Sequence, residues 1–232
     1  MTAHRYRMIW AIRTWKALKA AGLISGFCLC GLLMYHLYAS WALDLPSIAP
    51  LKTTEGLRTQ VTFDDGSHAP VVLIPLHEIP PHVANAFIVA QDSTYFTDKF
   101  FGGGLFAARA ADLLLRARSY AAGRRYGHAD RLHLQLNVML FLSREETAAV
   151  ELATTYFGKN AYGISAAAQV YYDKPLLELN LCEATMLASL PQGPFTYNPV
   201  KYPERAKEQQ RSVLEKMVRL GLASDAEMQA CK

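Results

Sequence analysis

Acidic residues are missing from the start of this sequence: no Asp or Glu precedes Asp44, although the 232 residues include 20 of them. Basic residues occupy the same stretch, namely Arg5, Arg7, Arg13, Lys16 and Lys19. Between Ala20 and Trp41 no side chain is formally charged. An uncharged apolar run of this length can cross a bilayer as a helix, and a basic flank favours the cytoplasmic side. We predict an uncleaved anchor. The alternative, a cleaved signal peptide, lacks an A-x-A-type exit.

Cysteine is scarce, and its positions exclude a disulfide-stapled scaffold. Cys28 and Cys30 lie in the apolar run, where free buried thiols are expected. Cys182 and Cys231 are far apart in sequence and could form one disulfide in an oxidising compartment. No spacing of Cys and His resembles a zinc site, and the chain has no internal repeat or low-complexity tract.

Apolar residues are plentiful enough for one core-forming domain, since the chain is 51% hydrophobic and 19% charged. We predict a basic cytoplasmic tail at 1–19, a transmembrane helix at 20–42, a linker at 43–60 and a single domain at 61–232. The domain is predicted to open with a small β-hairpin, because two β-prone segments flank an Asp-Gly turn. These segments are Val61–Phe63 and Val71–Ile74, with the turn at Asp65-Gly66.

The rest of the domain is predicted to be mostly α-helical. Amphipathic helices are expected from Pro81, over Leu105–Leu115, after Asn180, from Pro203 to Gly221 and after Ser224. Asn180 and Glu183 have the spacing of a capping box, and Pro191 must end that helix near Leu190. The apolar stretch Leu132–Leu142 is compatible with a helix or a strand.

Three segments carry a resemblance to a known family. They read YFGKNAYGI at Tyr156–Ile164, AAAQVYY at Ala166–Tyr172 and LNLCEATMLASLPQGPFTYNP at Leu179–Pro199. The run closely resembles the C-terminal third of the peptidoglycan glycosyltransferase domain, glycosyltransferase family 51, found in class A penicillin-binding proteins and monofunctional murein polymerases. The resemblance implies a mostly α, lysozyme-like fold for residues 61–232. It predicts that Ala167, Leu187 and Met217 are buried.

The same resemblance locates the expected chemistry after the Pro81 helix. The family's first motif reads E-D-x-x-F-x-x-H-x-G, and its Glu is the general base that deprotonates the acceptor sugar. Here Gln91-Asp92 stands at that place, Phe96 fits with one residue inserted, and Lys99 stands near the His. An amide cannot accept a proton near neutral pH, so we expect little or no polymerisation unless Asp92 or Asp98 substitutes.

The family's middle motifs are only partly matched. Gln135-Leu136 fits the Q-L of the second motif, and a rival alignment places Ser143–Glu146 before the I-L-E-x-Y-L-N segment. The third motif, R-K-x-x-E, has no match, which leaves Asp130 as the only stand-in for its acid. Arg124 and Arg125 belong to a basic segment that could capture pyrophosphate or anionic headgroups or could be a solvated loop. The basic segment comprises Arg116, Arg118, Arg124, Arg125 and Arg131.

The resemblance implies a membrane-anchored protein that polymerises lipid-linked disaccharide-peptide into glycan strands, if active. The rival functions are a non-catalytic scaffold that binds the precursor and a glycan-cleaving enzyme, which would normally need two carboxylates. No cofactor is assigned with certainty, and a divalent cation at the donor pyrophosphate stays open. Expected partners are the lipid-linked precursor, the membrane and other cell-wall synthesis proteins, with no nucleic acid. The expected location is the bacterial inner membrane, single pass, with the bulk outside the cytoplasm. No transpeptidase domain follows Lys232, so penicillin binding is not expected.

Overall fold

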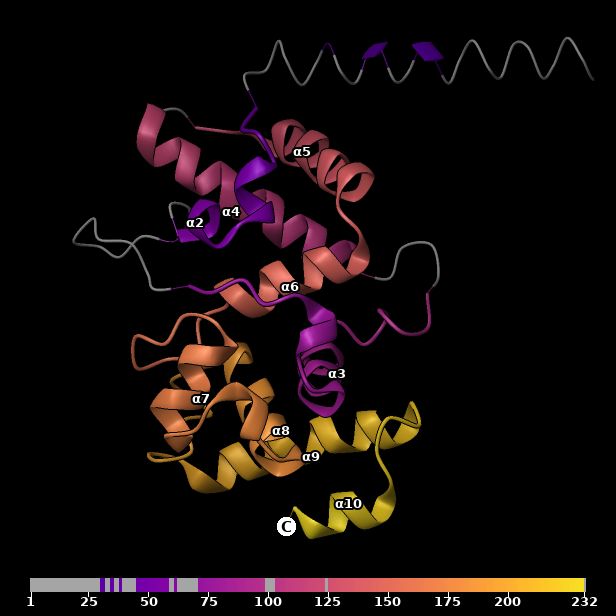
Figure 1. Cartoon of the computed structure of the whole chain (residues 1–232), viewed down its shortest axis with the longest axis vertical. Helices are drawn as coiled ribbons and strands as arrows, with labels where there is room; N and C mark the ends of the chain where they lie inside the picture. The colour runs from indigo at the N-terminus through magenta and orange to yellow at the C-terminus, as the bar shows by residue number, and fades with distance from the viewer. Residues whose placement is uncertain are drawn as a thin grey trace, which may run out of the picture. The chain divides into compact units, whose positions relative to one another are not determined.

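The structure is a computed structural model, and it describes residues 30–31, 34–35, 38, 45–58, 61, 71–98, 103–123 and 125–231. The chain divides into two compact units, Met1–Leu45 and Pro46–Lys232, each described by itself. The described part of the second unit is mostly helical and contains no strand. Its elements are η1 Ala49–Lys52, α2 Thr54–Arg58, η2 Leu76–Glu78, α3 Pro81–Gln91, α4 Gly104–Ala122, α5 His128–Phe141, α6 Arg144–Thr154, α7 Ile164–Tyr172, η3 Leu176–Glu178, α8 Leu181–Ser189, η4 Leu190–Gln192, α9 Pro203–Arg219 and α10 Asp225–Ala230 (Figure 1).

The predicted membrane helix at 20–42 falls mostly outside the described residues, as does the basic tail at 1–19. Only residues 30, 31, 34, 35 and 38 of that stretch are described, and all are helical. Over the residues that the structure describes, no helix has the length and apolar character of a membrane span. Cys30 is free, as expected, but it is exposed rather than buried.

The start of the second unit differs from the predicted linker at 43–60. Residues from Pro46 onward belong to the folded unit, because Leu51 on η1 and Leu57 on α2 are buried. The predicted β-hairpin is not confirmed. Residues 71–75 are in neither a helix nor a strand, and most of the other arm lies outside the described residues. The Leu73 amide instead donates to the Thr54 hydroxyl at 3.2 Å.

The core forms where α3 packs against α8 and α9 (Figure 1). Ala167 of α7, Leu187 of α8 and Met217 of α9 are each 0% exposed, which confirms their predicted burial. Phe87 of α3 lies against Phe157, with 6.0 Å between the ring centroids. The segment that carries the family resemblance therefore supplies much of this core.

Local sequence signals explain several helix ends. Asn180 caps α8 by accepting from the Glu183 amide at 2.9 Å, and the Glu183 carboxylate accepts from the Asn180 amide at 3.0 Å. Helix α8 ends at Ser189 and a 3-10 turn containing Pro191 follows, as predicted. Gly163 immediately precedes α7 and has φ +83°. A Cβ there would lie 2.5 Å from the Ala153 carbonyl oxygen, so only glycine fits between α6 and α7.

Two undecided stretches become helices. Leu132–Leu142 lies mostly in α5, which settles the choice between helix and strand. The basic segment is not one solvated loop, because Arg116 and Arg118 continue α4 and Arg131 lies in α5. Only a short connection at 123–127 separates the two helices.

A disulfide joins Cys182 of α8 to Cys231 after α10, with a Cα–Cα distance of 5.1 Å. This pairing was one of the open possibilities from the sequence. It ties the last helix of the chain to the core, although α10 itself has no buried residue.

Candidate functional site

Gln91 is the last residue of α3 and the residue that the resemblance aligns with the Glu of the family's first motif. Residues 83–90 of α3 are almost entirely buried, so packing fixes the place where this helix ends. Both ends of the Gln91 amide are engaged. Its Nε2 donates to the Ala188 carbonyl at 3.4 Å, and its Oε1 accepts from Arg109 Nη1 at 3.2 Å.

Arg109 brings a carboxylate to the same place. The Arg109 Nη1 that donates to Gln91 also donates to Glu151 Oε1 at 2.5 Å. Arg109 lies on α4 and Glu151 on α6, so three helices converge here. The Glu151 side chain is 10% exposed and that of Arg109 is 38% exposed. We call these residues the Gln91–Arg109–Glu151 cluster.

An open cavity of about 400 Å³ contains this cluster. We call it the Gln91 cavity. Arg116, about two helical turns beyond Arg109 on α4, adds a second guanidinium. The remaining lining residues are Leu113, Thr154, Thr155, Tyr156, Pro191 and Pro194. The cavity thus offers two arginines, one carboxylate, one amide and hydroxyl groups, a set suited to a phosphorylated or polyhydroxylated ligand.

Burial raises the pKa of the Glu151 carboxyl above its ordinary value of 4.5, although the charge of Arg109 lowers it. A hydrogen bond to Thr155 and the charge of Arg116 lower it further, without reversing the direction. A buried carboxyl with a raised pKa beside a cavity is a common property of functional acids.

The sequence reasoning missed Arg109 and Glu151. A signal was available, because each charge interrupts a helix of small and apolar residues. Residues 147–153 of α6 are otherwise Thr, Ala, Val and Leu and are buried. A single acid in such a run must find a partner inside the protein, but the sequence could not say which one.

Asp92, the predicted substitute base, is engaged in loop structure. Its Oδ1 accepts from the Thr94 amide at 3.0 Å and the Thr94 hydroxyl at 2.6 Å. Its Oδ2 accepts from the Gly103 amide at 3.2 Å, which links the end of α3 to the start of α4. Asp98 follows the turn at 93–97, and its amide donates to the Thr94 carbonyl at 2.9 Å.

The predicted substrate-binding residues do not gather at the cavity. Phe96 stacks edge-on against Tyr95. Asp130 accepts from the Gly127 amide at 2.7 Å at the start of α5, and Gln135 donates to the Gly104 carbonyl at 3.2 Å. Arg125 is exposed in the connection between α4 and α5. Lys99 and Arg124 lie outside the described residues. Of the described candidates, only Gln91 lines the Gln91 cavity.

A metal ion bound by the protein fits this cavity poorly. Its only carboxylate, Glu151, already pairs with Arg109. Elsewhere in the described part of the chain, no group of three or more His, Cys, Asp and Glu side chains could hold a metal ion.

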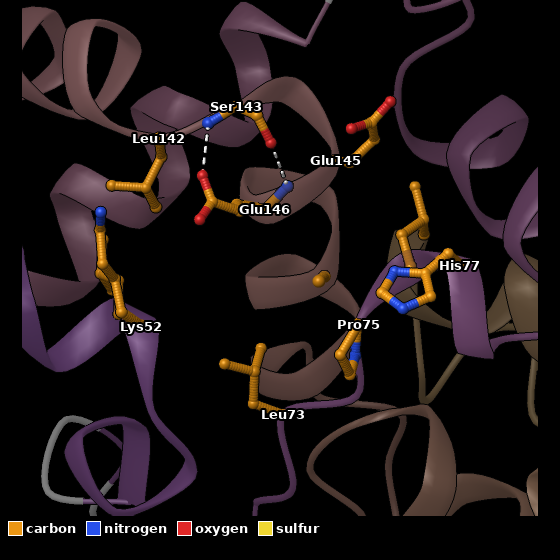
Figure 2. Close-up of a pocket in the computed structure, with 11 residues that line it drawn as sticks. Lys52, Leu73, Pro75, His77, Leu142, Ser143, Glu145 and Glu146 are labelled. Atoms are coloured by element: carbon orange, nitrogen blue, oxygen red, sulfur yellow. Dashed lines mark hydrogen bonds between the residues drawn. The ribbon is translucent and has the colours of Figure 1, made fainter.

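A second cavity, of about 330 Å³, lies between η1, the 71–77 segment and the start of α6. Figure 2 shows Lys52, Leu73, His77 and Glu145 around it. Its Glu146 carboxylate is committed to the α6 capping box with Ser143, at 2.6 Å from the Ser143 amide (Figure 2). None of the predicted site residues lines this cavity.

Comparison with known proteins assigns the family. Residues 134–218 match the Transglycosylase family. The chain is 34% identical over 171 residues to penicillin-binding protein 1A of Aquifex aeolicus, covering 64% of this chain and 23% of that protein. These matches support a transglycosylase domain of glycosyltransferase family 51 in this chain. The family resemblance found in Tyr156–Pro199 is thereby confirmed.

Other relatives of this transglycosylase domain have the same name. Penicillin-binding protein 1A of Pseudomonas aeruginosa is 41% identical over 97 residues, covering 42% of this chain and 12% of that protein. A crystal structure of penicillin-binding protein 1A from Haemophilus influenzae aligns with a TM-score of 0.42 and 22% identity, covering 74% of this chain and 19% of that one. The chain thus spans less than a quarter of the length of each of these proteins.

Proposed function

We propose that this chain is a membrane-anchored transglycosylase whose folded unit takes lipid-linked disaccharide-peptide as substrate and joins it into glycan strands. The Gln91 cavity is the observation that carries the proposal. It contains Gln91, which the resemblance aligns with the Glu of the family's first motif, and it presents Arg109 and Arg116. Arginine is well suited to a pyrophosphate because its planar fork donates two parallel hydrogen bonds.

The proposed location is the bacterial inner membrane, with one membrane pass and the folded unit outside the cytoplasm. The basic, acid-free stretch before Asp44 supports that orientation. The Cys182–Cys231 disulfide supports it independently, because such bonds persist in oxidising compartments and are rare in the cytosol. A lysozyme-like arrangement of the helices is part of the same proposal.

A second candidate function is a non-catalytic protein that holds the precursor for other cell-wall synthesis proteins. Gln91 favours it, since an amide cannot act as a general base. Asp92 favours it too, because both of its carboxylate oxygens accept hydrogen bonds from the surrounding loop.

The test uses the full chain in detergent micelles with a fluorescent lipid-linked disaccharide-peptide. Binding is followed by fluorescence anisotropy, and glycan strands are followed on gels. We expect saturable binding that weakens as salt is raised, because phosphate contacts are screened. Arg116→Ala should weaken binding, whereas Arg219→Ala, an exposed arginine on α9, should not. Precursor binding without glycan strands would support the non-catalytic function. Absence of precursor binding would refute both the transglycosylase and the non-catalytic function.

A further inference from the structure

We propose that Glu151 is the general base of this chain, in place of the glutamate that Gln91 replaces. The inference rests on the proposed function and adds the residue that would make it catalytic. Two oxygen atoms, Gln91 Oε1 and Glu151 Oε1, accept from the same nitrogen, Arg109 Nη1. A carboxylate is therefore present beside the expected position, but it comes from α6 instead of α3.

The carboxylates of Asp92 and Asp112 do not line the Gln91 cavity. Asp92 accepts from backbone amides on both oxygens. Asp112, on α4, pairs with Arg131 at 2.7 Å and lines a different cavity. Glu151 is the one carboxylate among the residues lining the Gln91 cavity, so it is the group there that can accept a proton from a bound ligand.

The step that Glu151 would perform is a single displacement. Its carboxylate accepts the proton of an acceptor sugar hydroxyl while that oxygen bonds to the anomeric carbon of the donor sugar. The bond between that carbon and the pyrophosphate oxygen breaks, and the lipid pyrophosphate leaves with the electron pair. Arg116 would stabilise the negative charge that develops on the leaving group. The proton then passes from Glu151 to solvent, so atoms and charge balance without a further reactant.

The environment of Glu151 suits this role. A general base works best when its pKa lies near the working pH, and burial shifts the pKa of Glu151 in that direction. Arg109 holds the carboxylate and the Gln91 amide together, which makes it a positioning residue.

The alternative reading is a buried ion pair that only joins α4 to α6. A structural pair of that kind would affect melting when broken, but it would not set the pH dependence of a reaction. The two readings are therefore separable by kinetics on folded variants.

The decisive experiment compares wild type, Glu151→Gln and the control Glu145→Gln in the full chain, with the same lipid-linked precursor. Glu145 lies on the same helix and is exposed. We expect Glu151→Gln to lower the rate of glycan synthesis by about 10²–10⁴-fold with precursor binding retained, and Glu145→Gln to leave both unchanged. The wild-type rate should rise with pH through the pKa of Glu151, and that rise should be absent in Glu151→Gln.

A compensating pair sharpens the test. Combining Gln91→Glu with Glu151→Gln returns a carboxylate to the family's position beside Arg109 and should recover part of the lost rate. If Glu151→Gln does not fold, Glu151→Asp keeps the charge on a shorter side chain and should retain an intermediate rate with the same pH dependence.

The outcomes separate this inference from the proposed function. Glycan synthesis by Glu151→Gln at the wild-type rate would overturn the role of Glu151 while leaving the proposed function intact. Precursor binding by wild type without any synthesis would also overturn it, and would leave the scaffold. Absence of precursor binding would instead refute the function on which the inference rests.

Discussion

Helices α8 and α5 are both rich in apolar residues, but α8 leaves none of them exposed, whereas α5 exposes most of them. Ala184, Leu187 and Ala188 of α8 are at most 1% exposed, packed between α3 and α9. On α5 only Leu134 and Val138 are buried. Its exposed large apolar residues are Leu132, Leu136, Met139, Leu140 and Phe141. Apolar composition thus produces a core only where a second element covers it.

The comparison also separates packing from chemistry. The segment with the strongest family resemblance, Tyr156–Pro199, contains Phe157, Ile164 and Leu187, which belong to the core. The residues that would carry out the reaction lie mainly on α3, α4 and α6, which bring Gln91, Arg109 and Glu151 to one cavity. Membership of the family is therefore supported by residues that hold the fold, and activity must be argued from other residues.

The largest effect that we expect comes from the disulfide that ties α10 to α8. The bond closes a loop of 49 residues, and removing it should destabilise the unit by about 4 kcal/mol on chain-entropy grounds. The double substitution Cys182→Ser with Cys231→Ser should lower the urea midpoint by a corresponding amount, as should a reducing agent added to wild type. As a matched control, the reducing agent should lower the urea midpoint of wild type and leave that of the double variant unchanged. Equal urea midpoints for wild type and the double variant would show that the bond does not stabilise the folded unit.

A matched pair of leucines tests the contrast between α8 and α5 directly. Leu187→Ala should cost about 2–5 kcal/mol, because it leaves a cavity in the core. Leu140→Ala should change stability by within about 0.5 kcal/mol, since Leu140 is 60% exposed and Leu187 is 0% exposed. Denaturant unfolding of both variants measures the difference. A large loss for Leu140→Ala would mean that the exposed face of α5 is covered in the folded protein.

Two helix caps extend the contrast to a smaller effect. Asn180→Ala should lower the free energy of unfolding by about 1 kcal/mol. Helix α8 is packed in the core, so its first turn cannot unwind to give the uncapped amide another partner. Ser224 caps α10 in the same way, but α10 has no buried residue, so Ser224→Ala should cost less. Thermal melting of the two variants shows which one loses more stability. A larger loss for Ser224→Ala would contradict the greater contribution of α8 to the core.

The smallest expected effect is a pH trend at the Gln91–Arg109–Glu151 cluster. The pKa of Glu151 is raised in the folded protein, so folding favours its protonated form. Its contribution to stability is then fully present below its ordinary pKa of 4.5 and is lost as pH rises through the folded value. The melting temperature of wild type relative to Glu151→Gln should therefore fall from acidic to neutral pH. A difference that rises over that range would mean that Arg109 outweighs burial.

Several features could be predicted from local sequence because local chemistry determines them. The caps at Asn180 and Ser224 depend on residues three positions apart, and the end of α8 depends on Pro191. The helix from Pro203 follows from a repeating apolar stripe, and its Met217 is buried as expected. The start of the folded unit was placed too late, because Leu51 and Leu57 lie in short elements with little periodicity.

The candidate site could be predicted only in part. Gln91 was located through the motif, and the structure puts it at a cavity. Asp130 and Gln135 were chosen by position in the motifs, but both bond to nearby backbone instead. Arg109 and Glu151 were missed because they are 42 residues apart, and no local rule relates residues at that distance.

By itself, then, the sequence determined the family resemblance and the helical character, because these depend on residue identity and on short spacings. The tertiary structure decided which charges meet. Arg109 could bind Glu151 and Gln91 together only once the packing of α3, α4 and α6 had brought their side chains to one cavity. A buried carboxylate needs a partner, and the choice among the available arginines follows from how those helices pack.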